Sequence, residues 1–150
     1  MNEKTFARAV SRKISVRAFY GVLFAAAFGL NLVWETAQMF AYQTELNEGW
    51  LKVFISCTGA SVIDAVVTVA IYALLARLMK PNQAKFYIGA AVLGALCAVG
   101  FEWLAFRFDL WSYSEQMVVL PVIGTGLLPF IQLTVLAPSA IWLAGKLKEI

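Results

Sequence analysis

Histidine is absent from the 150-residue chain. The protein therefore has no imidazole that could ligate a haem or a metal ion, or act as a general base. Acid–base chemistry must come from carboxylic acids, tyrosine, lysine, cysteine or water. Cysteine is scarce too, because Cys57 and Cys97 lie apart in apolar segments and form no C-x-x-C pair. We therefore expect no metal site and no redox pair, and the sequence implies no cofactor.

Charged residues are also rare in the chain. Only 14% of the residues are charged and 61% are hydrophobic, whereas a soluble domain has about 25% charged and about 45–50% apolar residues. This composition is typical of an integral membrane protein. We expect one membrane domain over residues 1–150.

Four long hydrophobic segments predict four transmembrane helices. They cover about residues 17–42, 53–79, 86–106 and 117–145. Such runs are too long for barrel strands, and lipid forces each spanning segment to satisfy its own backbone groups. The predicted fold is an all-α, four-transmembrane-helix bundle. Proline is expected to break the fourth helix, where Pro129 would free the carbonyl of Thr125 for a cavity.

Basic residues are unevenly distributed. Ten of the twelve lysines and arginines lie at the two ends of the chain or between the second and third segments. In a four-helix chain these regions share one side of the membrane, which the positive-inside rule identifies as the cytoplasm. We predict an inner (plasma) membrane protein with both termini cytoplasmic and a basic surface helix over residues 1–16. The net charge of +3 requires no nucleic acid, because anionic lipid is a sufficient partner.

Three acids lie inside the hydrophobic segments, namely Glu35, Asp64 and Glu102. At the helical rise they lie about 10, 16 and 6 Å from the outer ends of their helices, so we expect all three in the outer half of the membrane. An ionisable residue in lipid is costly and by default indicates a functional site. We predict that the three carboxyl groups converge and are catalytic. The alternative is structural pairing, such as Glu102 with Arg107.

The first two acids have polar residues on the same helix face. Asn31 and Gln38 lie one turn either side of Glu35, and Ser61 lies one turn before Asp64. Positions three or four residues apart share a helix face. We therefore predict that these side chains bind substrate beside the acids.

The third and fourth segments complete the predicted cavity. Ala91, Ala95 and Ala98 form a small-residue seam that ends at Glu102 and would allow close helix approach. The fourth segment offers the hydroxyl of Thr125 and the amide of Gln132.

Aromatic residues gather at the level of the acids. Trp34 and Trp103 are adjacent to Glu35 and Glu102 in the sequence, and Trp111 and Tyr113 follow the third segment. We predict that they line the site, where an aromatic face could shield a developing cation. A belt at the membrane interface is the alternative.

The segment NLVWETAQMF, residues 31–40, resembles the N-x-x-W-E helix of membrane-bound terpene cyclases of the fungal meroterpenoid type. In that family a glutamate in this context and an aspartate on a later helix are implicated in protonation. The resemblance implies that Glu35 is the acid and that Asp64 or Glu102 is its partner. Because the family has longer chains, it also implies a shortened bundle or a homo-oligomer. The segments FEW, WSY and GLLPFIQ further resemble small bacterial four-helix membrane proteins of unassigned function.

Three functions fit these patterns. The first is a metal-free enzyme that uses acid–base catalysis, of the cyclase or isomerase type, on an isoprenoid or another lipid. The second is a small proton- or cation-coupled transporter, in which the acids bind the ion. The third is an accessory subunit of a membrane complex. We expect membrane lipid and a lipophilic small molecule as partners.

Overall fold

The computed structural model describes residues 16–43, 49–81 and 83–149, so the surface helix predicted over residues 1–16 falls almost entirely outside it. The described residues form four helices that are long and apolar enough to cross a membrane, which confirms the all-helical four-helix fold. A short 3-10 helix prolongs the first one. The elements are α2 (Val16–Gln38), η1 (Met39–Ala41), α4 (Trp50–Leu78), α5 (Ala84–Arg107) and α6 (Leu127–Glu149).

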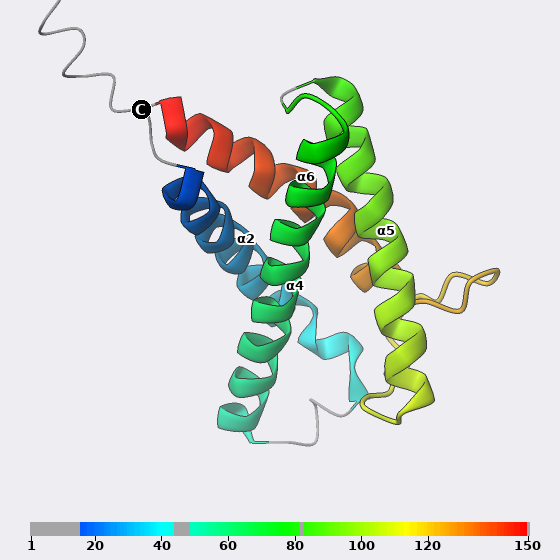
Figure 1. Cartoon of the computed structure of the whole chain (residues 1–150). Helices are drawn as coiled ribbons and strands as arrows, with labels where there is room; N and C mark the ends of the chain where they lie inside the picture. The colour runs from blue at the N-terminus through cyan, green and yellow to red at the C-terminus, as the bar shows by residue number, and fades with distance from the viewer. Residues whose placement is uncertain (1–15, 44–48, 82, 150) are drawn as a thin grey trace, which may run out of the picture.

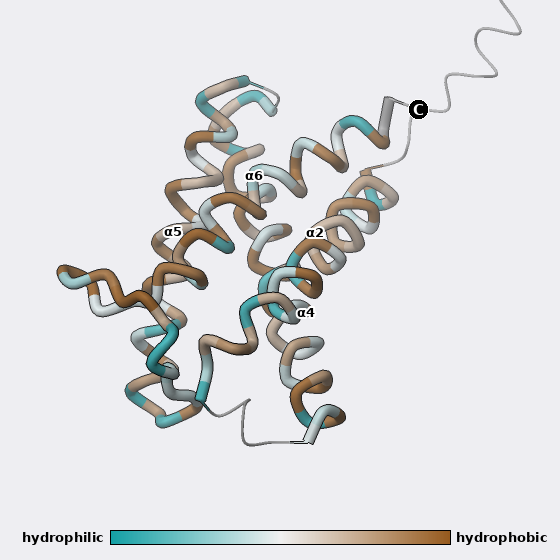
Figure 2. The backbone as a smooth tube through the Cα atoms, turned by 180° about the vertical axis from the view of Figure 1, so that it is seen from behind, coloured by the Kyte–Doolittle hydropathy of each residue, from teal (hydrophilic) through white to brown (hydrophobic). Residues whose placement is uncertain are grey.

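The four helices do not run parallel over their whole length. α4 and α5 are joined by a short connection at one end and diverge towards the other, while α6 runs from the middle of α5 to the first residues of α2 (Figure 1). α2 packs mainly on α4 and α6, and α5 packs mainly on α6. Figure 2 shows that the helices are largely hydrophobic along their length, as contact with lipid requires. The bundle is therefore closed at one end and spread at the other.

The closed half, where α4 meets α5, has an apolar core. Alanines, larger aliphatic side chains and aromatic rings fill it. The core consists of Phe19, Leu23, Ala27, Ala65, Ile71, Leu75, Phe86, Ala90, Ala137, Ala140, Ile141 and Ala144.

A close contact between α5 and α6 lies beside this core. A Cβ atom at Gly94 would collide with the backbone carbonyl of Leu133. Small residues permit such an approach between membrane helices. The buried face of α5 runs through Ala90 and Gly94, one residue before the predicted Ala91 and Ala95.

The fourth helix starts later than predicted. Residues 117–126 form a hairpin instead, with an antiparallel bridge between Val119 and Gly126. The hairpin projects sideways beside α5 (Figure 1) and is largely hydrophobic (Figure 2). The carbonyl of Thr125 is not free for a cavity, because it accepts the N–H of Leu120 at 2.9 Å. The prediction of a helix from residue 117 was therefore wrong.

Proline does not break α6 in the way the sequence suggests. Pro129 is the third residue of the helix, where a backbone N–H would have no intrahelical partner anyway. Pro138 is the proline inside the helix. The late start of α6, rather than a break within it, shapes the spread end of the bundle.

Two extended segments fill part of the spread end. Tyr42, just after η1, forms an antiparallel bridge with Tyr113. The pairing is extended by the N–H of Gln43, which donates to the carbonyl of Ser112 at 3.0 Å. This local ladder holds both tyrosines against the end of α5.

Candidate functional site

A cavity of about 560 Å³ lies in the spread half of the bundle. Its walls are mostly apolar, and none of the residues that line it is basic. The lining comes from all four long helices and from the segments that follow η1 and α5. It consists of Glu35, Gln38, Tyr42, Ser56, Ala60, Ile63, Asp64, Ala98, Phe101, Glu102, Leu104, Ala105, Leu110, Trp111, Pro129, Gln132 and Leu133.

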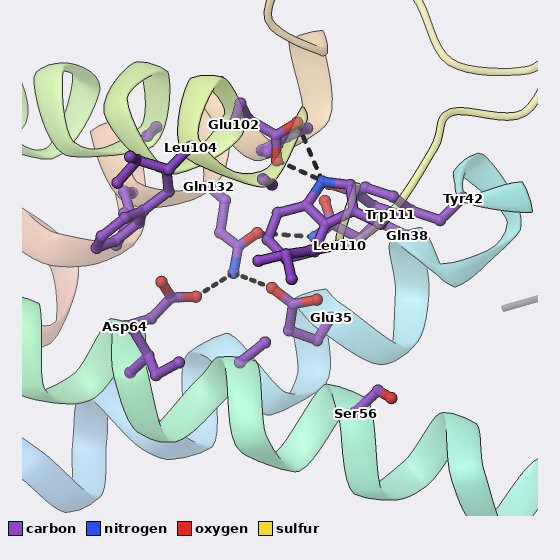
Figure 3. A pocket seen from close by; sticks show the side chains of 17 residues that line it. Glu35, Gln38, Tyr42, Ser56, Asp64, Glu102, Leu104, Leu110, Trp111 and Gln132 are labelled. Atoms are coloured by element: carbon purple, nitrogen blue, oxygen red, sulfur yellow. Dashed lines mark hydrogen bonds between the residues drawn. The ribbon is translucent and has the colours of Figure 1, made fainter. Parts of the chain in front are cut away.

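The three predicted acids all line this cavity (Figure 3). Asp64 and Glu102 are buried and Glu35 is half-buried. The predicted convergence is thus confirmed, whereas a catalytic role stays a prediction. One depth was wrong: because α4 begins at Trp50, Asp64 lies midway along the helix, about 21 Å from either end.

Gln132 joins two of the acids. Its Nε2 lies 2.8 Å from Glu35 Oε1 and 2.8 Å from Asp64 Oδ2. Those carboxyl oxygens are therefore no more than 5.6 Å apart. The same nitrogen lies 3.0 Å from Asn31 Oδ1. Figure 3 shows the amide nitrogen between the two carboxyl groups.

A chain of hydrogen bonds continues from Gln132 along α2. The carbonyl oxygen of Gln132 accepts a hydrogen bond from Gln38 Nε2 at 2.8 Å. The carbonyl oxygen of Gln38 in turn accepts one from the indole N–H of Trp34 at 2.9 Å. Both glutamines are buried, so the chain is sheltered from exchange with solvent.

Glu102 lies in a separate cluster of aromatic donors. Its Oε2 accepts a hydrogen bond from the Tyr113 hydroxyl and one from Trp111 Nε1 at 3.5 Å. Its Oε1 accepts one from the Tyr42 hydroxyl at 3.4 Å. The Tyr113 oxygen also accepts the N–H of Gly126 at 2.6 Å. Glu102 is thereby tied to the residue that precedes α6.

The tyrosines of this cluster are poor acids. Burial, and next the hydrogen bond to Glu102, raise the pKa of Tyr113 above its ordinary value. Burial and the nearby charge of Glu102 raise the pKa of Tyr42 as well. Both hydroxyls therefore remain neutral donors to Glu102 at neutral pH. Glu102 and Arg107, which the sequence offered as a structural ion pair, do not form one among the described residues.

Six predicted site residues lie outside the lining, and two of them, Asn31 and Tyr113, are hydrogen-bonded to residues that line it. Ser61 is buried, and its hydroxyl donates to the carbonyl of Cys57 at 2.7 Å. Thr125 is buried at the base of the hairpin. Trp103 is 68% exposed on the outer face of α5 and does not approach the acids. Trp34 reaches them only through its hydrogen bond to Gln38.

Two polar lining residues, Tyr42 and Ser56, were missed. Tyr42 shares a helix face with Asn31, Glu35 and Gln38 in the sequence pattern, and this periodicity was the signal for it. The apolar lining gave no such signal, because apolar residues of a membrane helix face lipid, protein or a cavity alike.

Comparison of the chain with known protein families, with curated proteins and with solved structures gives no match.

Proposed function

We propose that this protein is a membrane-embedded enzyme that moves protons on a lipophilic substrate, with cyclase- or isomerase-like chemistry. The carboxyl pair of Glu35 and Asp64, bridged by Gln132 in the cavity wall, carries the proposal. Ionisable groups this deep in a membrane protein are costly and are by default functional. Two carboxyl groups that differ in protonation can divide the roles of acid and base.

The pair can catalyse a balanced reaction. The protonated partner delivers its proton to one carbon of a substrate double bond, so that a C–H bond forms and a carbocation remains. After rearrangement or ring closure, the ionised partner takes a proton from a carbon next to the cation and a new double bond forms. The pair then holds as many protons as before, and no external reductant or oxidant is consumed.

The cavity suits a substrate that arrives from the bilayer. Its volume lies within the range of about 300–1,000 Å³ that small-molecule sites have. Ser56, Ile63 and Leu104 line it and are themselves exposed, so they form its rim. All three lie within membrane-spanning helices. A rim at this depth opens towards lipid chains, which favours an isoprenoid or another lipid as substrate.

Charge distribution supports an orientation. Arg77, Lys80 and Lys85 flank the connection between α4 and α5, at the closed end of the bundle. The last turns of α6, which contain Lys146, lie near the start of α2, also away from the spread end (Figure 1). By the positive-inside rule we place this end in the cytoplasm of a plasma membrane, with the cavity towards the outer leaflet.

A small proton- or cation-coupled transporter is the second candidate. One observation favours it: the hydroxyl of Thr68, one turn beyond Asp64, is fully buried and has no hydrogen-bond partner among the described residues. An ion that passed Asp64 would meet this oxygen next. Beyond Thr68, however, Ile71 and Leu75 belong to the filled apolar core. An enzyme needs only the one opening, and we therefore prefer it.

Lipid analysis tests the proposed enzyme. Extracts of cells that express the wild type and cells that express Glu35→Gln at the same level are compared by mass spectrometry. We expect a lipid product that is present with the wild type and absent with the variant. Identical lipid profiles, together with proton uptake by liposomes that contain the purified protein, would favour the transporter.

A further inference from the structure

We propose that Trp34 and Gln38 are positioning residues, which fix the direction of a hydrogen-bond chain so that Gln132 presents its amide nitrogen to Glu35 and Asp64. Trp34 and Gln38 act on these acids through Gln132. The significance of this arrangement for catalysis rests on the proposed function. The hydrogen-bond order itself does not.

The direction of the chain follows from its first donor. The indole N–H of Trp34 can donate a hydrogen bond but cannot accept one. Gln38 must therefore turn its carbonyl oxygen to Trp34, which leaves its NH₂ group facing Gln132. Gln132 must in turn accept with its carbonyl oxygen, so its own NH₂ group faces the acids. Each amide is oriented by its neighbour rather than by the carboxyl groups alone.

A second anchor holds the other side of the chain. The amide nitrogen of Asn31 donates to the backbone carbonyl of Ala27 at 2.9 Å. A carbonyl can only accept, so Asn31 must turn its oxygen towards Gln132. A donor-only group at one end and an acceptor-only group at the other thus require the same orientation of Gln132.

In this orientation the amide nitrogen of Gln132 has more oxygens around it than it has hydrogens to donate. An amide NH₂ group has two hydrogens, whereas three oxygens lie within 3.0 Å of Gln132 Nε2. A proton on either Glu35 or Asp64 supplies a further donor. The arrangement therefore suits a pair that holds one proton, with the amide stabilising the ionised partner.

Among the described residues, those that line the cavity around the pair carry no positive charge. Across the cavity, α5 contributes Glu102 and the end of η1 is followed by Tyr42. No lining residue from α4 or α6 is basic. Donation from Gln132 is therefore a direct way for the chain to favour negative charge on one partner.

Infrared spectroscopy of the purified full-length protein in lipid nanodiscs tests this inference without any substrate. The carbonyl band of protonated carboxyl groups is followed with pH and assigned to the pair with Glu35→Gln and Asp64→Asn. Gln132→Met removes the donor, and we expect the band to persist to higher pH by about one to two units. Trp34→Phe removes only the N–H, so Gln132 keeps one anchor of two and is less strictly oriented, and we expect an upward shift of up to about one unit.

Two controls separate a directed chain from a general disturbance of the bundle. Trp103→Phe makes the same change on the lipid-facing side of α5 and should leave the titration unchanged. In the Gln132→Met background, Trp34→Phe should add no further shift, because its effect passes through the amide.

The inference is overturned if Trp34→Phe titrates like the wild type, or if it shifts the band equally when Gln132 is absent. Its outcome is distinguishable from that of the proposed enzyme. A protein that shows the shifts and yet converts no lipid would keep this inference and refute the enzyme. Lipid conversion by a protein whose variants show no such shifts would keep the proposed enzyme and refute this inference.

Discussion

The two halves of the bundle use the same four helices for opposite purposes. In the closed half, alanines and aromatic rings such as Phe86 fill the space between helices that approach closely. In the spread half, the same helices carry Glu35, Asp64 and Glu102 around a cavity of about 560 Å³. The first half has an apolar core, whereas the second combines buried polar groups with open volume.

The difference shows how a small chain can hold acids in a membrane. Buried polar groups are costly unless they are hydrogen-bonded, and here Gln132 and the aromatic donors satisfy the carboxyl groups. Such a network supplies little of the packing that joins membrane helices, which depends on close contact. We infer that the closed half supplies the stability and the spread half the chemistry.

Removing a large ring from the closed half should have the largest effect on stability. Phe86 is fully buried and contacts the ring of Tyr72, with ring centroids 5.6 Å apart. We expect Phe86→Ala to lower the free energy of unfolding by about 3 kcal/mol or more, because it leaves a void. Thermal unfolding in detergent measures the loss. The lipid-facing control Ile88→Ala should change little, and equal losses would contradict a core confined to this half.

Adding a methyl group at the close contact of α5 and α6 should have the next largest effect. Gly94→Ala would place a carbon against the carbonyl of Leu133. We expect a loss of about 1–3 kcal/mol. Gly100→Ala on the same helix meets nothing within 4 Å and is the matched control. Equal thermal midpoints for the two variants would show that this approach does not limit stability.

The aromatic cluster of the spread half should make stability depend on alkaline pH. Below about pH 10 the tyrosines are protonated in both states, so they add no pH dependence. Above it, tyrosines in the unfolded chain ionise whereas Tyr42 and Tyr113, whose pKa values are raised, keep their protons. Stability should therefore fall, by up to about 1.4 kcal/mol per pH unit for Tyr42.

Chemical unfolding at pH 9 and at pH 11 measures this decline. The double variant Tyr42→Phe, Tyr113→Phe should lose less stability between these two pH values than the wild type. The same decline in both proteins would contradict the role given to the cluster.

The smallest effect is expected at Trp103. Its ring faces outwards and lines no part of the cavity. Trp103→Phe should leave lipid conversion unchanged, whereas Trp111→Phe, which removes a donor to Glu102, should reduce it. Lipid-conversion assays on the two variants measure this difference. A larger loss at Trp103 would mean that the aromatic next to the acid in the sequence lines the site after all.

Sequence reasoning was strongest where periodicity governs structure. Long apolar runs predicted the four helices, and the helical period placed the three acids on converging faces. It failed where the chain leaves the helix. The apolar residues from Met117 to Ile123 read as membrane helix, but the chain turns back there, with Gly124 at a φ of 68°. No periodic pattern in the sequence predicts such a hairpin.

The long-range partners could not be predicted for a related reason. The sequence placed Trp34 beside Glu35, yet its donor reaches Gln38 one turn further on. That Gln132 stands between Glu35 and Asp64 depends on where α6 begins. Packing between distant segments, not local pattern, decides such contacts.

Deuterium transfer tests the central claim most directly. The purified protein is incubated in heavy water with vesicles that contain an unsaturated isoprenoid lipid. The deuterium content of the lipid is then measured by mass spectrometry. An acid–base pair that protonates carbon must place solvent deuterium in the lipid. We predict labelling by the wild type and a loss of at least about 100-fold in Glu35→Gln and in Asp64→Asn. Labelling at equal rates in all three proteins would contradict the account.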